Sequence, residues 1–166
     1  MRVVALVACL LLAGCAAEAL EPRAAPSSAV TAPDFELRLL DGSTIEASRV
    51  WAERPVVLVF LTSWCTPCEQ RESEIAKLAR DYEGDVAFLG IAAADDAESL
   101  RAYADRHRVG YDLGLDAGQA VWRKYAVREP PAIVLVAKGG KVVKGWPGGL
   151  EPKRLDEEIG RWLVTS

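Results

Sequence analysis

Two cysteines with two residues between them carry the clearest chemistry in this sequence. Cys65 and Cys68 enclose Thr66 and Pro67, and Trp64 precedes them. If a helix begins here, Cys68 lies about one turn beyond Cys65, so the two sulfur atoms can reach each other. Thiols in such Cys-x-x-Cys sites ionise more readily than free cysteine, whose pKa is ~8.5. The spacing predicts thiol–disulfide exchange, in which Cys65 attacks a substrate and Cys68 resolves the mixed disulfide.

Other residues that bind metals or act as nucleophiles are few. The chain has four cysteines and a single histidine, His107, which lies between two arginines and is expected at the surface. A zinc site takes four protein ligands, or three with water, so we expect no metal site and no cofactor. A bridge between Cys65 and Cys68 would close a very short loop and stabilise the fold little through chain entropy. Its expected purpose is therefore redox chemistry.

The N-terminus has the pattern of an export signal. A basic second residue is followed by an apolar run that ends at Leu12-Ala13-Gly14-Cys15. A basic start, a short apolar stretch and small residues at its end are typical of secretory signal peptides. The last four residues resemble the bacterial lipobox, whose cysteine receives a lipid and becomes the new N-terminus. We expect residues 1–14 to be a signal peptide and Cys15 to be lipidated, on a protein that works outside the cytoplasm, where disulfides persist.

The remainder divides into a linker and one domain. Residues 15–33 are rich in Ala, Pro and Ser and lack an apolar period, which predicts a flexible tether after the lipidated cysteine. Residues 34–166 have the length of a single compact domain, and 51% of the chain is hydrophobic, enough to form a core.

Apolar patterns in residues 34–166 predict strands that alternate with helices. Continuous β-branched runs indicate strands buried on both faces, and helical spacing of apolar residues indicates amphipathic helices. The expected strands are 35–39, 56–61, 86–92, 132–137 and 141–145, and the expected helices are 67–82, 96–107, 117–125 and 152–163. This order predicts an α/β fold. The strand at 56–61 leads into the two cysteines, and the N-terminus of the following helix would favour a thiolate there.

Several motifs, taken in order, resemble the thioredoxin fold and, within it, the TlpA/ResA-like disulfide reductases of the redoxin group. The similar segments are Ala32-Pro33-Asp34-Phe35 with Asp41-Gly42, residues 57–68 with Trp-Cys-x-x-Cys, Tyr125-Ala126-Val127-Arg128 followed by Pro131, and Gly139-Gly140-Lys141-Val142. The resemblance covers residues 32–163. It implies a central mixed sheet flanked by helices, with an extra N-terminal strand and a central insertion. It also implies an extracytoplasmic protein disulfide oxidoreductase that works in the reductive direction.

The resemblance also assigns residues around the cysteines. It implies that Pro131 is cis and faces the cysteine pair. Trp64, Thr66, Pro67 and Pro130 would join it in binding an extended segment of the substrate. Pro130 stands where the family offers a backbone N–H to the substrate. Because proline has no N–H, one hydrogen bond to the substrate is expected to be missing.

The residue that manages the proton of Cys68 differs from the family pattern. Val59 stands where thioredoxin keeps a buried acid, and Arg71 stands where reductive relatives often carry a glutamate. Glu69 and Glu72 are close in sequence, and either is a candidate proton acceptor. A solvated helix surface is nevertheless the expected environment of both side chains.

The expected partners are protein thiols and disulfides outside the cytoplasm, a membrane electron donor and, through the lipid, the membrane itself. We expect a monomer. The net charge of −4 and the absence of a Lys/Arg-rich run argue against nucleic-acid binding. Two other functions stay open. Thr62 fits a thiol peroxidase of the peroxiredoxin branch, although Leu58 stands where that branch has a proline. A module that handles copper or haem could use the two soft thiolates.

Overall fold

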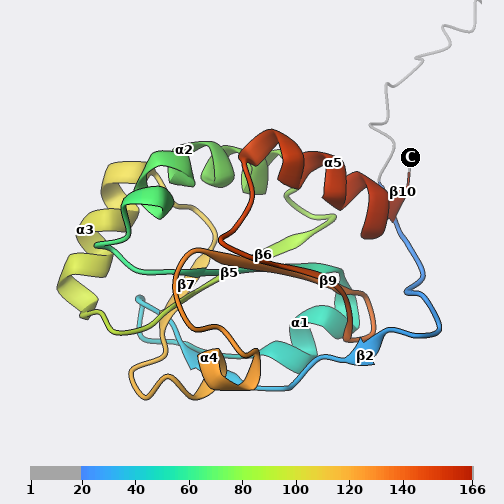
Figure 1. The fold of residues 1–166 in the computed structure, drawn as a ribbon, viewed down its shortest axis with the longest axis horizontal. Helices are drawn as coiled ribbons and strands as arrows, with labels where there is room; N and C mark the ends of the chain where they lie inside the picture. The colour runs from blue at the N-terminus through green and yellow to red at the C-terminus, as the bar shows by residue number, and fades with distance from the viewer. Residues whose placement is uncertain (1–19, 166) are drawn as a thin grey trace, which may run out of the picture.

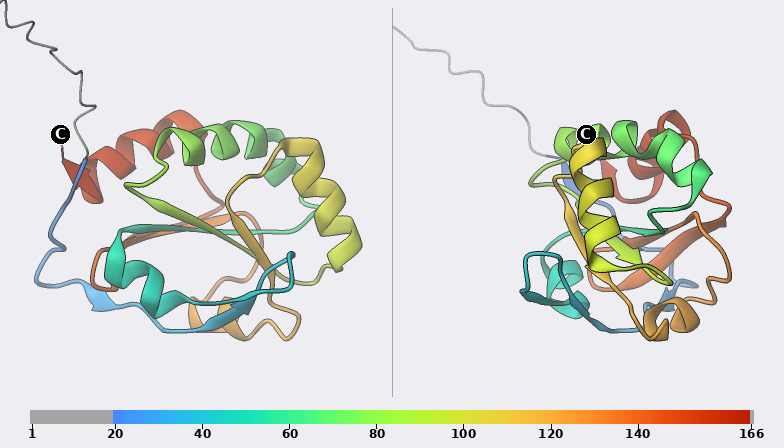
Figure 2. Two further views of the ribbon diagram at one scale, coloured as in Figure 1. Left: turned by 180° about the vertical axis from the view of Figure 1, so that it is seen from behind. Right: turned by 90° about the vertical axis from the view of Figure 1, so that its left-hand side faces the viewer.

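The computed structural model describes residues 20–165, which form a sheet covered by helices on both faces (Figure 1, Figure 2). The strands are β1 Glu21–Pro22, β2 Val30–Thr31, β3 Glu36–Arg38, β4 Thr44–Glu46, β5 Val56–Leu61, β6 Ala87–Ala92, β7 Asp112–Leu115, β8 Ala132–Ala137, β9 Lys141–Pro147 and β10 Val164–Thr165. The helices are α1 Ala47–Glu53, α2 Thr66–Asp81, α3 Ala97–His107, α4 Ala120–Lys124 and α5 Pro152–Trp162. The main sheet has the order β2-β9-β8-β5-β6-β7, which confirms the predicted central mixed sheet flanked by helices.

The central strand β5 places the loop that carries the cysteines next to the loop that ends at Pro131. All six residues of β5 are buried, as a strand packed on both faces requires. It runs parallel to β6 and antiparallel to β8, with Phe60 opposite Ala132. Ala132, which follows Pro131, is therefore paired with Phe60, near the end of β5 that leads into the cysteine loop. Pairing of two buried strands, distant in sequence, brings the two halves of the site together.

Two apolar cores lie on opposite faces of the sheet, beneath the two groups of helices that Figure 1 shows. Helices α2, α3 and α5 cover one face, where Ile75, Leu100 and Ile159 are buried. Burial of each such side chain stabilises the fold by about 1.5–3 kcal/mol before the entropy cost of ordering it. Helices α1 and α4 cover the other face with Trp51 and Trp122, so these tryptophans are packing residues.

Helix α1 and strand β7 are among the elements of the domain that were not predicted. Helix α1 has seven residues and no side-chain cap, and it is held mainly by Trp51, which packs against Gly140 in the β8–β9 turn. Such a short helix depends on tertiary packing more than on its own propensity. Strand β7 has only four residues and includes Gly114, which lies close to Leu37 and to the carbonyl oxygen of Arg38. Both segments are too short to show the apolar period by which a helix or a strand is predicted from sequence.

The structure has strands before residue 34, which is where the sequence predicted the folded domain to begin. Strand β1 pairs with β10 after the last helix, and β2 pairs with β9. The backbone N–H of Arg23 also donates to the carbonyl oxygen of Leu163 at 2.7 Å. Two-residue strands carry no periodic pattern, so sequence reasoning could not detect this pairing.

Candidate active site

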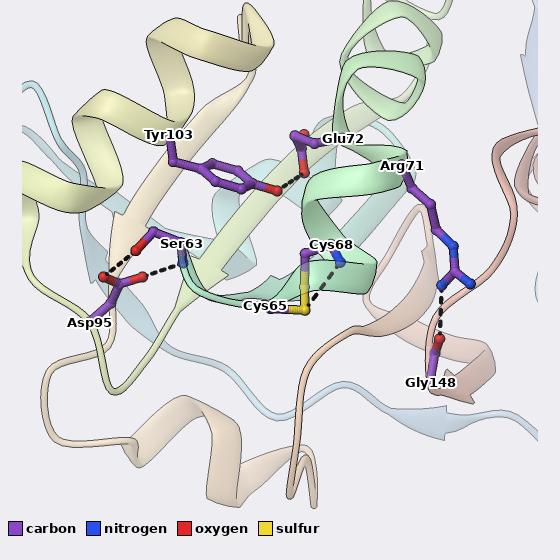
Figure 3. The surroundings of a disulfide bond; sticks show 8 residues. All are labelled: Ser63, Cys65, Cys68, Arg71, Glu72, Asp95, Tyr103 and Gly148. Carbon is purple, nitrogen blue, oxygen red and sulfur yellow. Dashed lines mark hydrogen bonds between the residues drawn. A yellow bond between two sulfur atoms is a disulfide. The ribbon is translucent and has the colours of Figure 1, made fainter.

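The cysteine pair sits at the N-terminus of α2 (Figure 3). Cys65 is the N-cap residue, and its Sγ accepts a hydrogen bond from the backbone N–H of Cys68 at 3.1 Å. Pro67 occupies the first turn, where a missing N–H costs nothing. Because α2 has 16 residues, aligned peptide dipoles and free N–H groups favour negative charge at this end. The local structure therefore stabilises the anionic form of the sulfur at Cys65.

The two sulfur atoms are joined in the structure. The Cys65–Cys68 bond has an S–S distance of 2.06 Å, with the two Cα atoms 5.2 Å apart. The molecule is thus described in its oxidised form, and the predicted pairing is geometrically satisfied. Both cysteines are buried, while Trp64, Thr66 and Pro67 around them are exposed. Trp64 is 62% exposed, which is unusual for so large an apolar side chain and suits a contact surface.

The loop after β6 holds the segment that precedes Cys65. Asp95 accepts hydrogen bonds from the backbone N–H and the Oγ of Ser63, the latter at 2.8 Å (Figure 3). The indole Nε1 of Trp64 donates to the carbonyl oxygen of Ala94 at 2.9 Å. Asp96, next in sequence, caps α3, with its Oδ1 accepting from two backbone N–H groups. The approach to the nucleophile is therefore fixed by hydrogen bonds on one side.

A cis peptide bond links Pro130 and Pro131 on the other side of the site. Pro131 and Cys68 line the same small cavity of about 10 Å³, roughly the space of one water molecule. A larger groove of about 640 Å³ begins at Pro130 and is lined mainly by apolar residues, among them Val127, Ile133 and Trp146. The structure thus brings the predicted residues Trp64, Thr66, Pro67, Pro130 and Pro131 to the surroundings of the cysteine pair.

Glu72 differs from its sequence-based expectation, because it is buried and not on a solvated face. The residue is 1% exposed, and its carboxylate accepts a hydrogen bond from Tyr103 at 3.0 Å (Figure 3). A second hydrogen bond, from Tyr111, is 2.6 Å long. Burial raises the pKa of Glu72, and the two phenol hydrogen bonds only partly oppose this. Glu72 also lines the small cavity beside Cys68. It lies four residues after Cys68, on the same face of α2.

The other candidate acid, Glu69, is exposed as expected and pairs with Arg106 at 3.3 Å.

His107 was expected at the surface, and this expectation is wrong. Its side chain is buried against Tyr103, and its Nδ1 lies 3.2 Å from the Oγ of Ser73. Burial lowers the pKa of His107, and the nearby Arg106 adds to this effect. The flanking arginines reach solvent while the histidine faces inward, four residues after Tyr103.

Tyr103 and Tyr111 belong to this site, but sequence reasoning gave them no role there. Tyr103 lies within the expected helix 96–107, and Tyr111 stands in a connection before a short strand. The available signal was the spacing of Cys68, Glu72 and Ile75, which puts the acid on the buried stripe of α2. A buried carboxylate needs hydrogen-bond donors, and these must come from a neighbouring element. Among residues 20–165, no group of three or more His, Cys, Asp or Glu side chains is arranged to hold a metal ion.

Comparison with known proteins shows the family of this chain. A family model described as the AhpC/TSA family matches residues 29–144. The chain belongs to the AhpC/TSA family. Thiol-disulfide oxidoreductase ResA of Halalkalibacterium halodurans is 28% identical over 127 residues, covering 76% of this chain and 72% of the relative. Thioredoxin-like protein YneN of Bacillus subtilis is 24% identical and covers 77% of this chain and 76% of its own.

A solved structure shows the same fold. A secreted disulfide oxidoreductase of Mycobacterium tuberculosis superimposes with a TM-score of 0.71 at 22% identity, covering 76% of this chain and 95% of that one. The family, the relatives and the joined cysteines together identify this member of the AhpC/TSA family as a thiol–disulfide oxidoreductase, with Cys65 and Cys68 as its redox pair. The predicted thioredoxin-like fold is confirmed.

Proposed function

We propose that this protein reduces disulfide bonds in exported proteins, with Cys65 as the attacking thiolate and Cys68 as the resolving thiol. The observation that carries the proposal is the position of Cys65 as the N-cap of α2, where its sulfur accepts the N–H of Cys68. A thiolate is the nucleophile in thiol–disulfide exchange, and this position favours the thiolate.

The proposed reaction has two exchange steps. In the dithiol form, the Cys65 thiolate attacks one sulfur of the substrate disulfide, forms a mixed disulfide and releases the other substrate sulfur as a thiolate, which takes up a proton. Cys68 then loses its proton and attacks the Sγ of Cys65. This step forms the Cys65–Cys68 disulfide seen here and releases the second substrate thiolate. Two electrons pass from the cysteine pair to the substrate, and an external dithiol donor returns the pair to the reduced form.

Glu72 is the proposed proton acceptor for Cys68. It shares with Cys68 a cavity that is large enough for about one water molecule, which can carry the proton between the two groups. Because burial raises the pKa of Glu72, the carboxylate is a stronger base than an exposed glutamate. A general base works best when its pKa lies near the working pH. Glu69 is exposed and paired with Arg106, so it is the weaker candidate.

The surface around the cysteines is the proposed site for the substrate polypeptide. Trp64 offers an exposed apolar side chain on one side of the pair, and Pro130 and Pro131 form the other side. Thr66 and Pro67 are exposed between them. Pro130 has no N–H to offer, so its carbonyl oxygen is its only backbone hydrogen-bonding group. Side-chain contacts then carry more of the affinity, and the apolar groove beside Pro130 suits them.

We further propose that the protein is exported and anchored through a lipid on Cys15. Residues 1–19, with Cys15 and the signal segment, lie outside the described part of the chain. Among residues 20–165, no helix has the length and apolar character needed to cross a bilayer. The proposal is supported by the lipobox-like Leu12-Ala13-Gly14-Cys15.

The register of the sheet gives such an anchor a direction. Val30 pairs with Val142, which pairs with Val136, and Val136 lies opposite Val56 at the start of β5. Cys65 follows the other end of β5. The six backbone steps from Cys15 to Glu21, where β1 begins, reach at most roughly 20–22 Å, at ~3.3–3.6 Å per residue. The anchor would then leave the domain at the end remote from the cysteine pair.

The experiment that tests the function is trapping with Cys68→Ser. With the resolving thiol removed, the reduced variant is expected to accumulate a mixed disulfide between Cys65 and a protein disulfide such as insulin. Mass spectrometry of the non-reduced adduct would locate the bond. Cys65→Ser serves as the matched control, because it keeps one thiol in the same helix turn. An adduct on Cys68 in that control but none on Cys65 in the test variant would contradict the proposed roles.

A further inference from the structure

Arg71 joins the cysteine helix to the segment that follows β9. It lies three residues after Cys68, and its guanidinium donates through Nη1 to the carbonyl oxygen of Gly148 at 3.2 Å (Figure 3). Its Nη2 lies 2.6 Å from the carboxylate of Glu151, the N-cap residue of α5. The Arg71 side chain is 25% exposed, whereas that of Glu151 is 68% exposed. The ion pair is therefore partly screened by solvent, and the bond to the carbonyl of Gly148 is the more specific contact.

The segment held by Arg71 packs directly against the cis-proline. A Cβ built on Gly149 would lie 3.0 Å from the Cγ and 3.1 Å from the Cβ of Pro131. The φ angle of Gly149 is +70°, a left-handed conformation that favours glycine. Pro131, Gly149 and Arg71 line the same small cavity as Cys68. A continuous row of contacts thus runs from α2 through Arg71 and Gly149 to the ring of Pro131.

We propose that Arg71 is a positioning residue that fixes the cis-proline side of the substrate site at its distance from the cysteine pair. The inference rests on the proposed function and deepens it, because it concerns how a polypeptide substrate is held. Asp95 and Ser63 fix the Trp64 side of the site by hydrogen bonds. Arg71 does the same for the Pro131 side. A polypeptide that bridges both sides depends on their separation, whereas a small disulfide that needs only the Sγ of Cys65 does not.

This assignment differs from a direct effect on the sulfur atoms. The guanidinium points away from Cys65 toward Gly148 (Figure 3), and its charge is balanced by Glu151. Loss of Arg71 should therefore change the binding of a polypeptide more than the intrinsic reactivity of the thiol. Misplacement of a substrate by about 1 Å is enough to slow a reaction by up to about 10²-fold.

The test compares Arg71→Ala with Arg80→Ala, measured with a protein disulfide and with a small aromatic disulfide. Arg80 lies on the same helix and also donates to a backbone carbonyl, that of Arg108, at 3.1 Å, but remote from the cysteines. For Arg71→Ala we expect kcat/KM for insulin to fall about tenfold, mainly through KM. That factor corresponds to the loss of one hydrogen bond to a charged group. The rate with the small disulfide should stay unchanged, and Arg80→Ala should leave both rates unchanged.

A second variant reaches the same contact from the other side. Gly149→Ala places a methyl group 3.0 Å from the Cγ of Pro131 and 3.6 Å from the Nη1 of Arg71, so it should disturb the same contact and reproduce the selective loss with insulin. Because both changes act through one contact, the double variant should lose less than the product of the two single effects. Independent, multiplicative effects would contradict the proposed coupling. Equal slowing of both substrates by Arg71→Ala would also overturn it, because a purely structural loss affects both.

Hydrogen exchange tests the positioning without any substrate. The amide of Gly149 donates to the carbonyl oxygen of Trp146 at 3.2 Å, next to the carbonyl that Arg71 holds. In Arg71→Ala this amide should exchange about tenfold faster, for the same lost hydrogen bond, while Arg80→Ala leaves it unchanged. Unchanged protection would refute the role of Arg71. If protection falls as expected but the native protein reduces no disulfide, the positioning stands and the proposed function fails.

Discussion

Cys65→Ser is expected to abolish disulfide reduction, bringing turnover to the background rate of the external reductant. A serine hydroxyl stays protonated at neutral pH even as the N-cap of α2, and it cannot form the disulfide that stores the two electrons. Turnover is measured as the reduction of insulin with a dithiol donor. The fold should be unaffected, because serine is a good N-cap residue and the replaced bond closes only a short loop.

The matched control for this loss is Cys68→Ser. It should also stop turnover, but it should still complete the first exchange step, seen as a single burst of released substrate thiol. Cys65→Ser should show no burst. A burst of equal size in both variants would contradict the distinct roles of the two cysteines and would leave either sulfur able to act first.

Glu72→Gln is expected to slow the second step, in which Cys68 attacks the mixed disulfide, by about 10²-fold. This is the lower range of what a positioned general base contributes. Glutamine keeps the size of the side chain, but it cannot take a proton from Cys68. Its amide oxygen can accept the hydrogen bond of one of the two tyrosines, and its NH2 group, which stands at the place of the other carboxylate oxygen, can donate to the hydroxyl oxygen of the second. The rate is measured as the disappearance of the mixed disulfide after rapid mixing. Glu74→Gln, on an exposed position of the same helix, is the control and should behave as the native protein.

The pH dependence gives the same prediction a second readout. In the folded protein, burial raises the pKa of Glu72 above its ordinary value of 4.5. At a pH between the ordinary pKa of 4.5 and the raised pKa, Glu72 keeps its proton in the folded chain but has lost it in the unfolded chain. The free energy of unfolding therefore falls as the pH rises from about 4.5 through the raised pKa. Urea unfolding across this range should show a larger fall in the native protein and in Glu74→Gln than in Glu72→Gln, where Asp112, whose pKa burial also raises, still contributes. An identical fall in Glu72→Gln would show that this carboxylate is not the buried acid responsible.

Much of the fold could be predicted from the sequence, because its central strands and long helices carry strong apolar patterns. Strands β5 and β8 begin and end where predicted, since each is a continuous apolar run that only a doubly covered strand can bury. Helix α2 was placed within one residue at each end, with Pro67 and the cysteines marking its start. Such patterns depend only on the spacing of neighbouring residues, so they can be read directly from the sequence.

The parts that were missed depend on contacts between distant segments. Helix α1 and strand β1 are too short to show a period, and they are held by Trp51 and by pairing with β10. Glu72 and His107 were assigned to the surface because their residue types usually lie there. Burial of Glu72 becomes favourable only when α3 and the segment before β7 deliver Tyr103 and Tyr111. The sequence could therefore name Glu72 as a candidate proton acceptor from its position near Cys68, but its burial could be seen only in the tertiary structure.

The most direct test of the central claim is a redox titration of the Cys65–Cys68 bond in glutathione buffers of known potential. The full chain is equilibrated, quenched by alkylation and digested, and the fraction of peptide that carries the intramolecular bond is measured by mass spectrometry. The account predicts one reversible transition of two electrons, in which the ratio of disulfide to dithiol changes tenfold for about every 30 mV. A pair that stays reduced at every potential, or that forms only adducts with glutathione, would contradict it.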